Sequence, residues 1–363
     1  MSRRPLRILY NASAVPVQRA GAGVYALELG AALATRPSLE LSVLSPRDAG
    51  FGEHVRTPAK RVARLLWEEA RLASAPQLRD ADIYHGTHFF TPRSKTPAVA
   101  TVHDLTFFRI PRRYSRARRT YYRRLARAAT RAARLIVPSA AVAADCVRFL
   151  GYPPENIRVI AEAPRAGLQP ASASEVEAFR REYGIEGPYL ACLGTAEPGK
   201  RAVDAIRAMP AIRERRPGTT LVLGGNPGPL SGALEREVAR LGLAGTVRFL
   251  GYLPDRALPA FLTRAVALIF PSLYEGFGLP PLEALACGTP VIATDALAMS
   301  EILAGGTLFV PTRDPAAIAA AALSLFEGDR RETLASAGAE FVRRFTWARA
   351  AAETEAVYRE LVP

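Results

Sequence analysis

The hydrophobic and polar positions of this chain alternate between short apolar runs, many of them β-branched, and longer amphipathic stretches with helical periodicity. This alternation favours parallel sheets built from strand–helix–strand units, because each apolar run has the length of a buried strand and a helix-length segment follows it. In the first half, the predicted strands are Leu6–Tyr10, Leu39–Leu44, Ile83–Tyr84, Val99–Val102, Leu135–Val137 and Ile157–Ile160. In the second half, they are Tyr189–Leu193, Thr220–Leu223, Val247–Phe249, Ala267–Phe270, Pro290–Ala293 and Thr307–Val310.

Helix-length segments, such as Val24–Thr35 and Ala202–Glu214, separate these strands, and a last amphipathic segment, Trp347–Leu361, has no strand after it. The stretch AEAPRAGLQPASASE at 161–175 is rich in Pro, Ala and Ser and lacks periodicity, which is typical of a linker. A chain of 363 residues is too long for one ordinary core. The pattern therefore predicts two Rossmann-like α/β domains.

Composition narrows the class of protein. Apolar residues make up 49% and charged residues 23%, as in globular proteins, and no run approaches the ~18 apolar residues that span a bilayer. The first residues, MSRRPLRILYNAS, lack the apolar region of a signal peptide. Cys146, Cys192 and Cys287 are odd in number and widely spaced, which fits neither a disulfide framework nor a zinc site. These features predict a cytoplasmic protein.

The net charge of +14 comes mostly from arginine, and residues 109–134 carry many arginines and no acidic residue. A helix from about Ser115 would place Tyr122, Leu125 and Ala129 on one face and arginines on the others. Such a helix fits a solvated surface, or a surface that docks on anionic lipid and holds the protein at the inner face of a membrane. No helix-turn-helix, RRM or zinc motif accompanies the charge, so nucleic acid is not expected as a partner.

The segment with the clearest chemical content is PSLYEGFGLPPLEALACGTPVIAT, residues 271–294. It places Glu275 and Glu283 eight positions apart across a glycine-rich turn, where Pro280 and Pro281 suit the start of a short helix, LEALAC. A helix N-terminus beside bare glycine backbone favours an anion, because its N–H groups and its dipole both attract negative charge. Two carboxylates beside such a position suit the hydroxyl groups of a ligand whose middle is a diphosphate. The segment therefore predicts a nucleotide-sugar ligand.

This segment resembles the donor-site signature of the family 4 (group 1) retaining glycosyltransferases, two glutamates with GFG between them, and the likeness covers nearly the whole chain. The resemblance implies the GT-B fold, in which two Rossmann-like domains face a central cleft. The implied parts are an acceptor domain at 1–165, a nucleotide-sugar donor domain at 166–345, and a helix at 346–363 that packs back on the first domain.

The resemblance also implies roles for residues outside that segment. RAGAGVYALELGAAL carries Gly23 just before a predicted helix, in a loop that approaches the donor phosphates in the family. AVATVHDLTFF carries His103, whose imidazole or backbone would contact a hydroxyl of the transferred sugar, although a histidine at a strand end is also compatible with a structural role. YLACLGTAEPGKR carries Lys200, which would stabilise the charge that develops on the leaving diphosphate. Gly199 stands where the family usually has a second cation, and Arg201 is the candidate to replace it.

Within the segment itself, Glu283 would accept hydrogen bonds from the ribose, and Glu275 would hold sugar hydroxyls and support charge at the anomeric carbon. The loops at 221–229 and 249–255 would shape the base pocket. The other donor-binding positions implied are Gly194, Tyr252, Gly276, Phe277, Gly278 and Leu279. No carboxylate is placed as a nucleophile, and the resemblance implies a retaining reaction. No D-x-D motif lies in a suitable loop, so the reaction is expected to need neither a metal nor a cofactor. The catalytic residues implied are His103, Lys200 and Glu275.

The leading interpretation is a hexosyltransferase that moves a hexose from a nucleotide-sugar to a hydroxyl acceptor, which would be a glycolipid or polysaccharide precursor. The variants GTxEP and HDL resemble mannosyl- or rhamnosyl-type enzymes, so GDP-mannose is favoured over a UDP-hexose. Two alternatives stay open. A nucleotide-sugar epimerase of the same fold would lack the two glutamates with GFG between them. A non-catalytic module that binds a sugar nucleotide or a membrane is supported by Gly199 alone.

Overall fold

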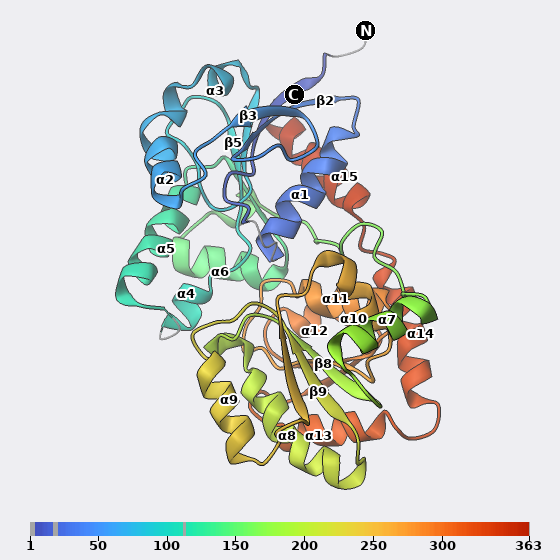
Figure 1. The fold of residues 1–363 in the computed structure, drawn as a ribbon. Coiled ribbons are helices and arrows are strands. Elements are labelled where there is room, and N and C mark those ends of the chain that lie inside the picture. Colours follow the sequence, from blue (N-terminus) through green and yellow to red (C-terminus); the bar gives the residue numbers. More distant parts are fainter. Residues whose placement is uncertain (1–3, 17–20, 112–113, 363) are drawn as a thin grey trace. The chain divides into compact units, whose positions relative to one another are not determined.

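The computed structural model describes residues 4–16, 21–111 and 114–362, which form two compact α/β units. The first unit contains residues 1–166 together with 345–363, and the second contains residues 167–344. Each unit has a parallel sheet with helices packed on it, as the ribbon shows (Figure 1). The predicted fold class, two Rossmann-like domains, is confirmed.

The strands of the first unit are β1 (Leu6–Asn11), β2 (Leu39–Ser45), β3 (Glu53–Arg56), β4 (Ile83–Gly86), β5 (Ala98–Thr101), β6 (Arg134–Val137) and β7 (Ile157–Val159). Its helices are α1 (Gly21–Ala34), α2 (Arg61–Ala70), α3 (Pro76–Asp80), α4 (Thr106–Arg109), α5 (Arg116–Ala129), α6 (Ala140–Leu150) and α15 (Trp347–Leu361), with 3-10 turns η1 (Leu72–Ser74) and η3 (Pro154–Asn156). Within the described residues, the sheet has seven parallel strands in the order β3-β2-β1-β4-β5-β6-β7. The order reverses between β1 and β4, which makes their carboxyl ends the topological switch point.

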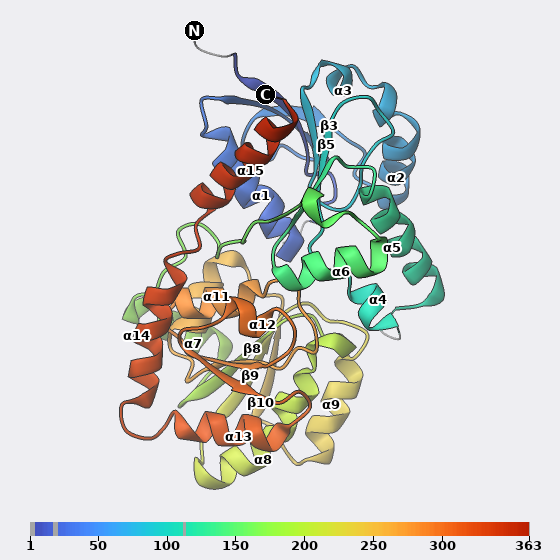
Figure 2. The same ribbon diagram turned by 180° about the vertical axis from the view of Figure 1, so that it is seen from behind.

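Helix α15 belongs to the first unit although it ends the chain. It packs beside α1 (Figure 2), and Trp347 and Tyr358 join Tyr25 in the core on that face of the sheet. The Tyr358 hydroxyl lies 2.6 Å from Nδ1 of His85, and Nε2 of His85 lies 2.9 Å from the Thr101 hydroxyl. Burial lowers the pKa of His85 to about 3. This neutral histidine therefore anchors the final helix to the sheet.

The strands of the second unit are β8 (Tyr189–Leu193), β9 (Thr220–Gly224), β10 (Val247–Gly251), β11 (Leu268–Phe270), β12 (Val291–Thr294) and β13 (Thr307–Val310). Its helices are α7 (Ala173–Tyr183), α8 (Ala202–Arg215), α9 (Ser231–Arg240), α10 (Leu258–Thr263), α11 (Leu279–Ala286), α12 (Met299–Ile302), α13 (Pro315–Ser324) and α14 (Arg330–Val342), with 3-10 turns η4 (Pro198–Lys200) and η5 (Asp255–Ala257). Over the described part of this unit, six strands run parallel in the order β10-β9-β8-β11-β12-β13. Here the switch point lies between β8 and β11.

Every strand that the hydrophobic pattern predicts is present, with ends shifted by no more than two residues. The pattern missed β3, because EHVR has no apolar alternation and the strand pairs only at the edge, with β2. It also placed the start of α1 too late: the helix begins at Gly21, so Gly23 lies in its first turn rather than before it.

The linker predicted at 161–175 is shorter than expected. Helix α7 begins at Ala173 because Ser172 and Glu175 form a capping box, in which each side chain accepts a hydrogen bond from the other residue's backbone N–H. The helix ends at Gly184, whose left-handed backbone (φ 59°) suits glycine.

Candidate active site

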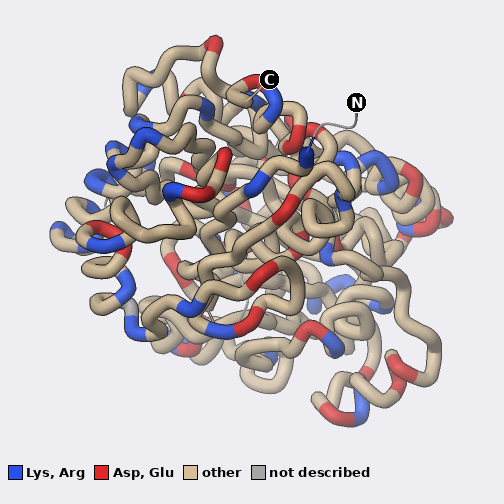
Figure 3. The backbone as a smooth tube through the Cα atoms, turned by 90° about the horizontal axis from the view of Figure 1, so that it is seen from above, with Lys and Arg blue, Asp and Glu red and all other residues tan. Residues whose placement is uncertain are grey.

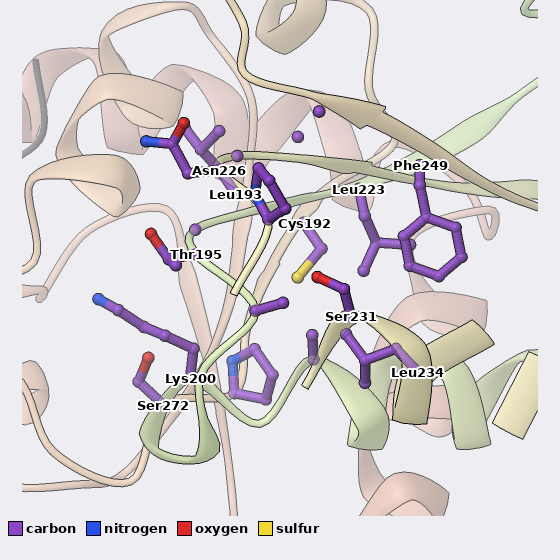
Figure 4. Close-up of a pocket in the computed structure, with 18 of the residues that line it drawn as sticks. Cys192, Leu193, Thr195, Lys200, Leu223, Asn226, Ser231, Leu234, Phe249 and Ser272 are labelled. Carbon is purple, nitrogen blue, oxygen red and sulfur yellow. The ribbon is translucent and has the colours of Figure 1, made fainter. Parts of the chain in front are cut away.

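A cavity of about 270 Å³ opens at the carboxyl edge of the second unit's sheet, where the ends of β8, β9, β10 and β11 meet. This is the switch point, the usual ligand position in an open α/β sheet. Figure 4 shows the polar side-chain ends of Lys200, Thr195 and Asn226 on one side of the view and the side chains of Leu223 and Phe249 on the other. The cavity therefore has Lys200 on one side and the larger apolar side chains, with the Ser231 hydroxyl beside them, on the other; Glu235 also lines it.

Glycine backbone forms part of the cavity wall. A Cβ atom on Gly225, which has φ of 135°, would lie 2.3 Å from the carbonyl oxygen of Gly194. The loops after β8 and β9 are held together by two backbone hydrogen bonds, from Gly194 N–H to Gly224 at 2.9 Å and from Ala196 N–H to Asn226 at 3.3 Å. Only glycine at position 225 permits this close approach. Gly194, a predicted donor-binding residue, does line the cavity.

Lys200 lies in η4 and lines the cavity. Its Nζ donates a hydrogen bond of 2.7 Å to Oε1 of Glu275, and the two side chains are 25% and 15% exposed. The ammonium group lies 5.5 Å from the ring centroid of Phe270, the last residue of β11. The two loops are also joined by a hydrogen bond of 2.9 Å from Leu273 N–H to the Gly199 carbonyl. Two of the three predicted catalytic residues are thus brought together at the switch point, where Glu275 fixes the cation without itself lining the cavity.

Arg201, the candidate second cation, does not line the cavity. Its Nε and Nη2 donate to the two carboxylate oxygens of Asp204 at 2.8 and 2.5 Å, and Asp204 is buried. Among the described residues that line the cavity, Lys200 is the only cation. A contact between Arg201 and a phosphate would require the bidentate pair to open, and it stays a prediction.

Glu283 lies in the second turn of α11, because the helix begins at Leu279, three residues earlier than the predicted LEALAC. Pro280 and Pro281 occupy the first helical turn, as their sequence positions suggest. Since proline has no N–H, this helix N-terminus has fewer donors for an anion than a helix without these prolines.

Glu283 is buried, with 1% of its surface exposed, and residues 276–279 are buried as well. Neither Glu283 nor residues 276–279 line the cavity. Gly278 has φ of 100°, and a Cβ atom there would lie 2.8 Å from the side chain of Met299. The expected contacts of these residues with the ribose and the sugar stay predictions.

The two loops expected to shape the base pocket do contribute to the cavity. Asn226 comes from the first loop and Phe249 from the second, whereas Tyr252, which was predicted instead, does not line it. Sequence reasoning also missed Thr195 and Ser272. Phe249 is a large aromatic residue that is 42% exposed although it lies in a strand, a feature that the structure reveals and the sequence does not.

In the first unit, His103 follows β5, and both of its ring nitrogens have partners. Nε2 lies 2.9 Å from the carbonyl oxygen of Thr87, and Nδ1 lies 3.0 Å from Oε1 of Glu162. Burial lowers the pKa of His103, but the hydrogen bond and charge of Glu162, the bond to Thr87 and the charge of Asp104 outweigh it, so the net pKa is raised. Because a carbonyl only accepts, Nε2 carries a hydrogen. Because both ring nitrogens already have hydrogen-bond partners, the predicted contact with a sugar hydroxyl would have to come from the His103 backbone.

A second cavity, of about 470 Å³, lies in the first unit beside the carboxyl ends of β1 and β2. Arg47, Arg64, His88 and Tyr121 are among its lining residues. The predicted residue Gly23 packs against its wall, since a Cβ atom there would lie 3.2 Å from the lining residue Pro16. This cavity has a mixed polar and aromatic lining.

Metal-ligating side chains do not gather in the part of the chain that the structure describes: no group of three or more His, Cys, Asp or Glu is placed to hold an ion. Cys192 lines the switch-point cavity, but burial raises the pKa of its thiol to about 12, which keeps it neutral.

A cavity at the switch point of an open α/β sheet is a usual position for a nucleotide, and the cation of Lys200 there favours an anionic ligand. The family pattern "Glycosyl transferases group 1" matches residues 175–341, and "Glycosyltransferase Family 4" matches residues 19–162. The chain belongs to the family 4 glycosyltransferases and has their GT-B fold.

The chain is 29% identical to O-antigen chain mannosyltransferase B of Escherichia coli, over 98% of this chain and 100% of that protein. It is 32% identical to the D-inositol 3-phosphate glycosyltransferase of Kribbella flavida over 62% of this chain and 56% of that protein. The Anabaena protein HepE, solved in complex with UDP and glucose, has a TM-score of 0.76 at 19% identity, covering 98% of this chain and 100% of that one.

Proposed function

We propose that the protein is a retaining, metal-independent hexosyltransferase that uses a nucleotide-sugar, with mannose as the favoured sugar. Its acceptor would be a hydroxyl group of a glycolipid or polysaccharide precursor. The observation that carries this proposal is the switch-point cavity, with Lys200, which is paired to Glu275, on one side and Leu223 and Phe249 on the other. A nucleoside diphosphate has the same polarity, since its base has apolar faces and its diphosphate is anionic.

Each group at the polar end has a role in this reaction. The bond between the anomeric carbon and the diphosphate breaks, and a bond from the acceptor oxygen forms on the same face of the sugar. Lys200 stabilises the charge that develops on the diphosphate, more strongly in the transition state than before it. The leaving phosphate takes the acceptor's proton. Glu275 holds the ammonium group in place, which leaves its second carboxylate oxygen available for a sugar hydroxyl.

The preference for mannose rests on similarity over the full length to an O-antigen mannosyltransferase. The likeness to a structure that holds UDP and glucose keeps a UDP-hexose as the competing donor. The cavity supplies hydrogen-bonding groups from Thr195, Asn226 and Ser231, which would suit either base.

The test is thermal unfolding of the protein with GDP-mannose, UDP-glucose and an ADP-hexose, each with and without EDTA. A true donor at a hundred times its dissociation constant should stabilise the fold by about 2.7 kcal/mol. We expect GDP-mannose to give the largest shift, and EDTA to leave it unchanged. No shift with any donor would refute the proposal. A thermal shift accompanied neither by slow hydrolysis of the donor nor by transfer to any acceptor would instead favour the non-catalytic binding module.

We also propose that the first unit docks on anionic lipid through residues 109–134; of these, Arg112 and Arg113 lie outside the described residues. Elsewhere the chain has basic and acidic residues interleaved (Figure 3). On α5, Arg116, Arg124 and Arg127 are exposed and no acid is present. Tyr122 of this segment stacks on Phe107 and is half-buried, so it is not an exposed anchor for the lipid. No described helix is long and apolar enough to cross a bilayer.

A further inference from the structure

The switch-point cavity has one acidic side chain among the described residues that line it, Glu235 of α9. Ser231, Leu234 and Glu235 are spaced so that they share one face of this helix, and all three line the cavity. Figure 4 shows Ser231 and Leu234 on the side of the cavity that carries Phe249, away from the ammonium group of Lys200. Helix α9 therefore places a carboxylate on the side of the cavity opposite the cation.

The carboxylate of Glu235 is available to a ligand. The residue is exposed, and no hydrogen bond or ion pair joins its side chain to another described residue. Glu237, two positions later on the same helix, is instead paired with Arg207 and Arg240. Of the two acids on α9, the one that lines the cavity is thus the one whose charge is not used within the fold.

A hydroxyl lies on the same face of α9, one helical turn before this carboxylate. Oγ of Ser231 accepts a hydrogen bond of 3.0 Å from the backbone N–H of Gly228. The hydroxyl hydrogen of Ser231 is not used in that bond, so it can be donated to a ligand in the cavity. An ionised carboxylate has no hydrogen to donate and accepts with both oxygens. One turn of α9 thus presents a donor beside a pair of acceptors.

Guanine has the complementary edge. Its O6 accepts while its adjacent N1–H and 2-amino group both donate, so O6 suits the Ser231 hydroxyl and the two donors suit the two oxygens of Glu235. Uracil has a single N3–H between two carbonyl oxygens, and one of these would face a carboxylate oxygen and be repelled. Adenine has an amino group beside an unprotonated ring nitrogen, which a carboxylate cannot pair with. The carboxylate therefore favours guanine both by attraction and by rejection of the other bases.

The ring of Phe249 offers the base a surface on which to stack. It is 42% exposed, whereas Leu223 and Leu234 on the same side of the cavity are 8% and 4% exposed. Every base has a π-face, so stacking on an aromatic ring adds affinity without selecting among bases. Selection must then come from polar groups at the edge of the base.

We propose that Glu235 determines which nucleotide the protein uses, by pairing with guanine, and that the donor is a GDP-sugar. The base stacks on Phe249, its edge pairs with Ser231 and Glu235, and the diphosphate extends toward Lys200 on the opposite side of the cavity. This inference rests on the proposed function, because it assigns the base of the proposed donor. It decides between the GDP-sugar and the UDP-hexose, which similarity to other proteins leaves in competition.

The test is calorimetry of the full chain with GDP, UDP, ADP and inosine diphosphate (IDP), which differs from GDP only in lacking the 2-amino group. We expect the wild type to bind GDP about tenfold or more tighter than it binds the other three. E235Q should bind GDP about 10- to 100-fold more weakly, because an amide presents its own N–H groups to the donors of guanine. The affinity of E235Q for UDP and ADP should not fall.

Two ligands test the pairing itself. E235Q should bind GDP and IDP equally, because the 2-amino group has lost its acceptor. Xanthosine diphosphate, in which an oxygen replaces that amino group, should bind E235Q more tightly than it binds the wild type, because the Gln amide can donate to this oxygen. A role of Glu235 in the fold alone would produce neither effect.

Two further variants serve as controls. E237Q alters an acid of the same helix that does not line the cavity, and it should bind GDP as the wild type does. F249A should weaken binding of GDP, UDP and ADP alike, by about tenfold or more, because stacking does not select a base. Wild-type affinity of F249A for all three would mean that the base lies elsewhere, which would overturn the inference.

Three results with Glu235 itself would also overturn it. Wild-type affinity for GDP in E235Q would mean that the carboxylate does not contact the base. An equal loss for GDP, UDP and ADP would assign Glu235 to the ribose or the diphosphate, which all three share. A wild type that prefers UDP or ADP to GDP would contradict the assignment of guanine directly.

Donor turnover separates this inference from the proposed function. If GDP binds through Glu235 but GDP-mannose is neither hydrolysed nor transferred, the guanine site stands and the proposed transferase fails. If the wild type prefers UDP and transfers the sugar of a UDP-hexose, the guanine site fails and the transferase stands. If none of the nucleotides binds, both are refuted.

Discussion

Replacement of Lys200 by methionine tests the chemistry of the switch-point cavity most directly. The substitution removes the cation and keeps an apolar stem of similar length against Phe270. A unit charge about 4 Å from another interacts by about 4 kcal/mol at an effective dielectric constant near 20. The Lys200 side chain is 25% exposed, so water screens it only in part. Because the diphosphate gains only part of a charge in the transition state, we expect a loss of about 2–4 kcal/mol, or about 30- to 1000-fold in turnover.

The assay must separate lost catalysis from a weakened fold. K200M leaves the carboxylate of Glu275, which is 15% exposed, without its cation, and we expect the free energy of unfolding to fall by about 1–3 kcal/mol. The double variant K200M/E275Q removes that carboxylate charge and should recover part of the lost stability. Turnover, measured as donor hydrolysis at saturating donor, should stay low in the double variant. K200R, which keeps the charge, should retain more activity than K200M.

Two results would refute this reasoning. Turnover at the wild-type level in K200M would mean that the diphosphate lies elsewhere. Recovery of turnover in K200M/E275Q, in step with recovered stability, would mean that Lys200 acts on the fold and not on the reaction. Calorimetry of donor binding completes the comparison, since a cation that acts mainly in the transition state should change turnover more than affinity.

Two further predictions concern Glu283 and His103. Glu283→Ala should weaken donor binding, measured by calorimetry, by about 1–3 kcal/mol, because charge-assisted hydrogen bonds to the donor are lost. The control Glu340→Ala, which alters an exposed glutamate, should leave donor affinity unchanged. Unchanged affinity in Glu283→Ala would mean that the buried Glu283 has a structural role only. For His103, NMR of the ring should give a pKa above 6.5, the ordinary value, and E162Q should lower it, while His85 should stay neutral down to about pH 4. Because folding raises the pKa of His103, protonation of His103 stabilises the folded state below about pH 6.5, and this stabilisation is lost as pH rises through the folded pKa. A measured pKa at or below 6.5 would contradict this prediction.

The strands were predictable from sequence because burial on both faces requires nearly continuous apolar runs. β8, with the sequence YLACL, and β12, VIAT, are buried over most of their length, and both were found. β3 was not, because its edge position removes that requirement. The capping box at Ser172 and Glu175 was visible as S-x-x-E, but the low-complexity composition around it favoured a linker.

The candidate site was predictable only in part, because side-chain partners far apart in sequence leave no local pattern. Lys200 and Glu275 were each recognised from their own segments, but their contact joins residues 75 positions apart. Glu162, the partner of His103, lies 59 positions away in the stretch assigned to the linker. The pair of Arg201 with Asp204 is the exception, since an arginine three positions before an aspartate at a helix start is a local signal for an ion pair.

Sheet topology explains why the contact between Lys200 and Glu275 forms despite their separation in sequence. The chain leaves β8, builds β9 and β10 on one side, and returns to place β11 against the other side of β8. Whatever residues follow β8 and β11 must then meet at the same edge, and nothing else in the sheet lies between them. The order of strands therefore determines where a ligand binds, and the residue types that follow the two strands determine its charge. In the first unit the corresponding edge, after β1 and β4, is held by the neutral bond from the Thr87 hydroxyl to the Asn11 carbonyl at 2.6 Å. The same topology thus brings Lys200 and Glu275 together at the edge of one unit, and the hydroxyl of Thr87 and the carbonyl of Asn11 at the corresponding edge of the other.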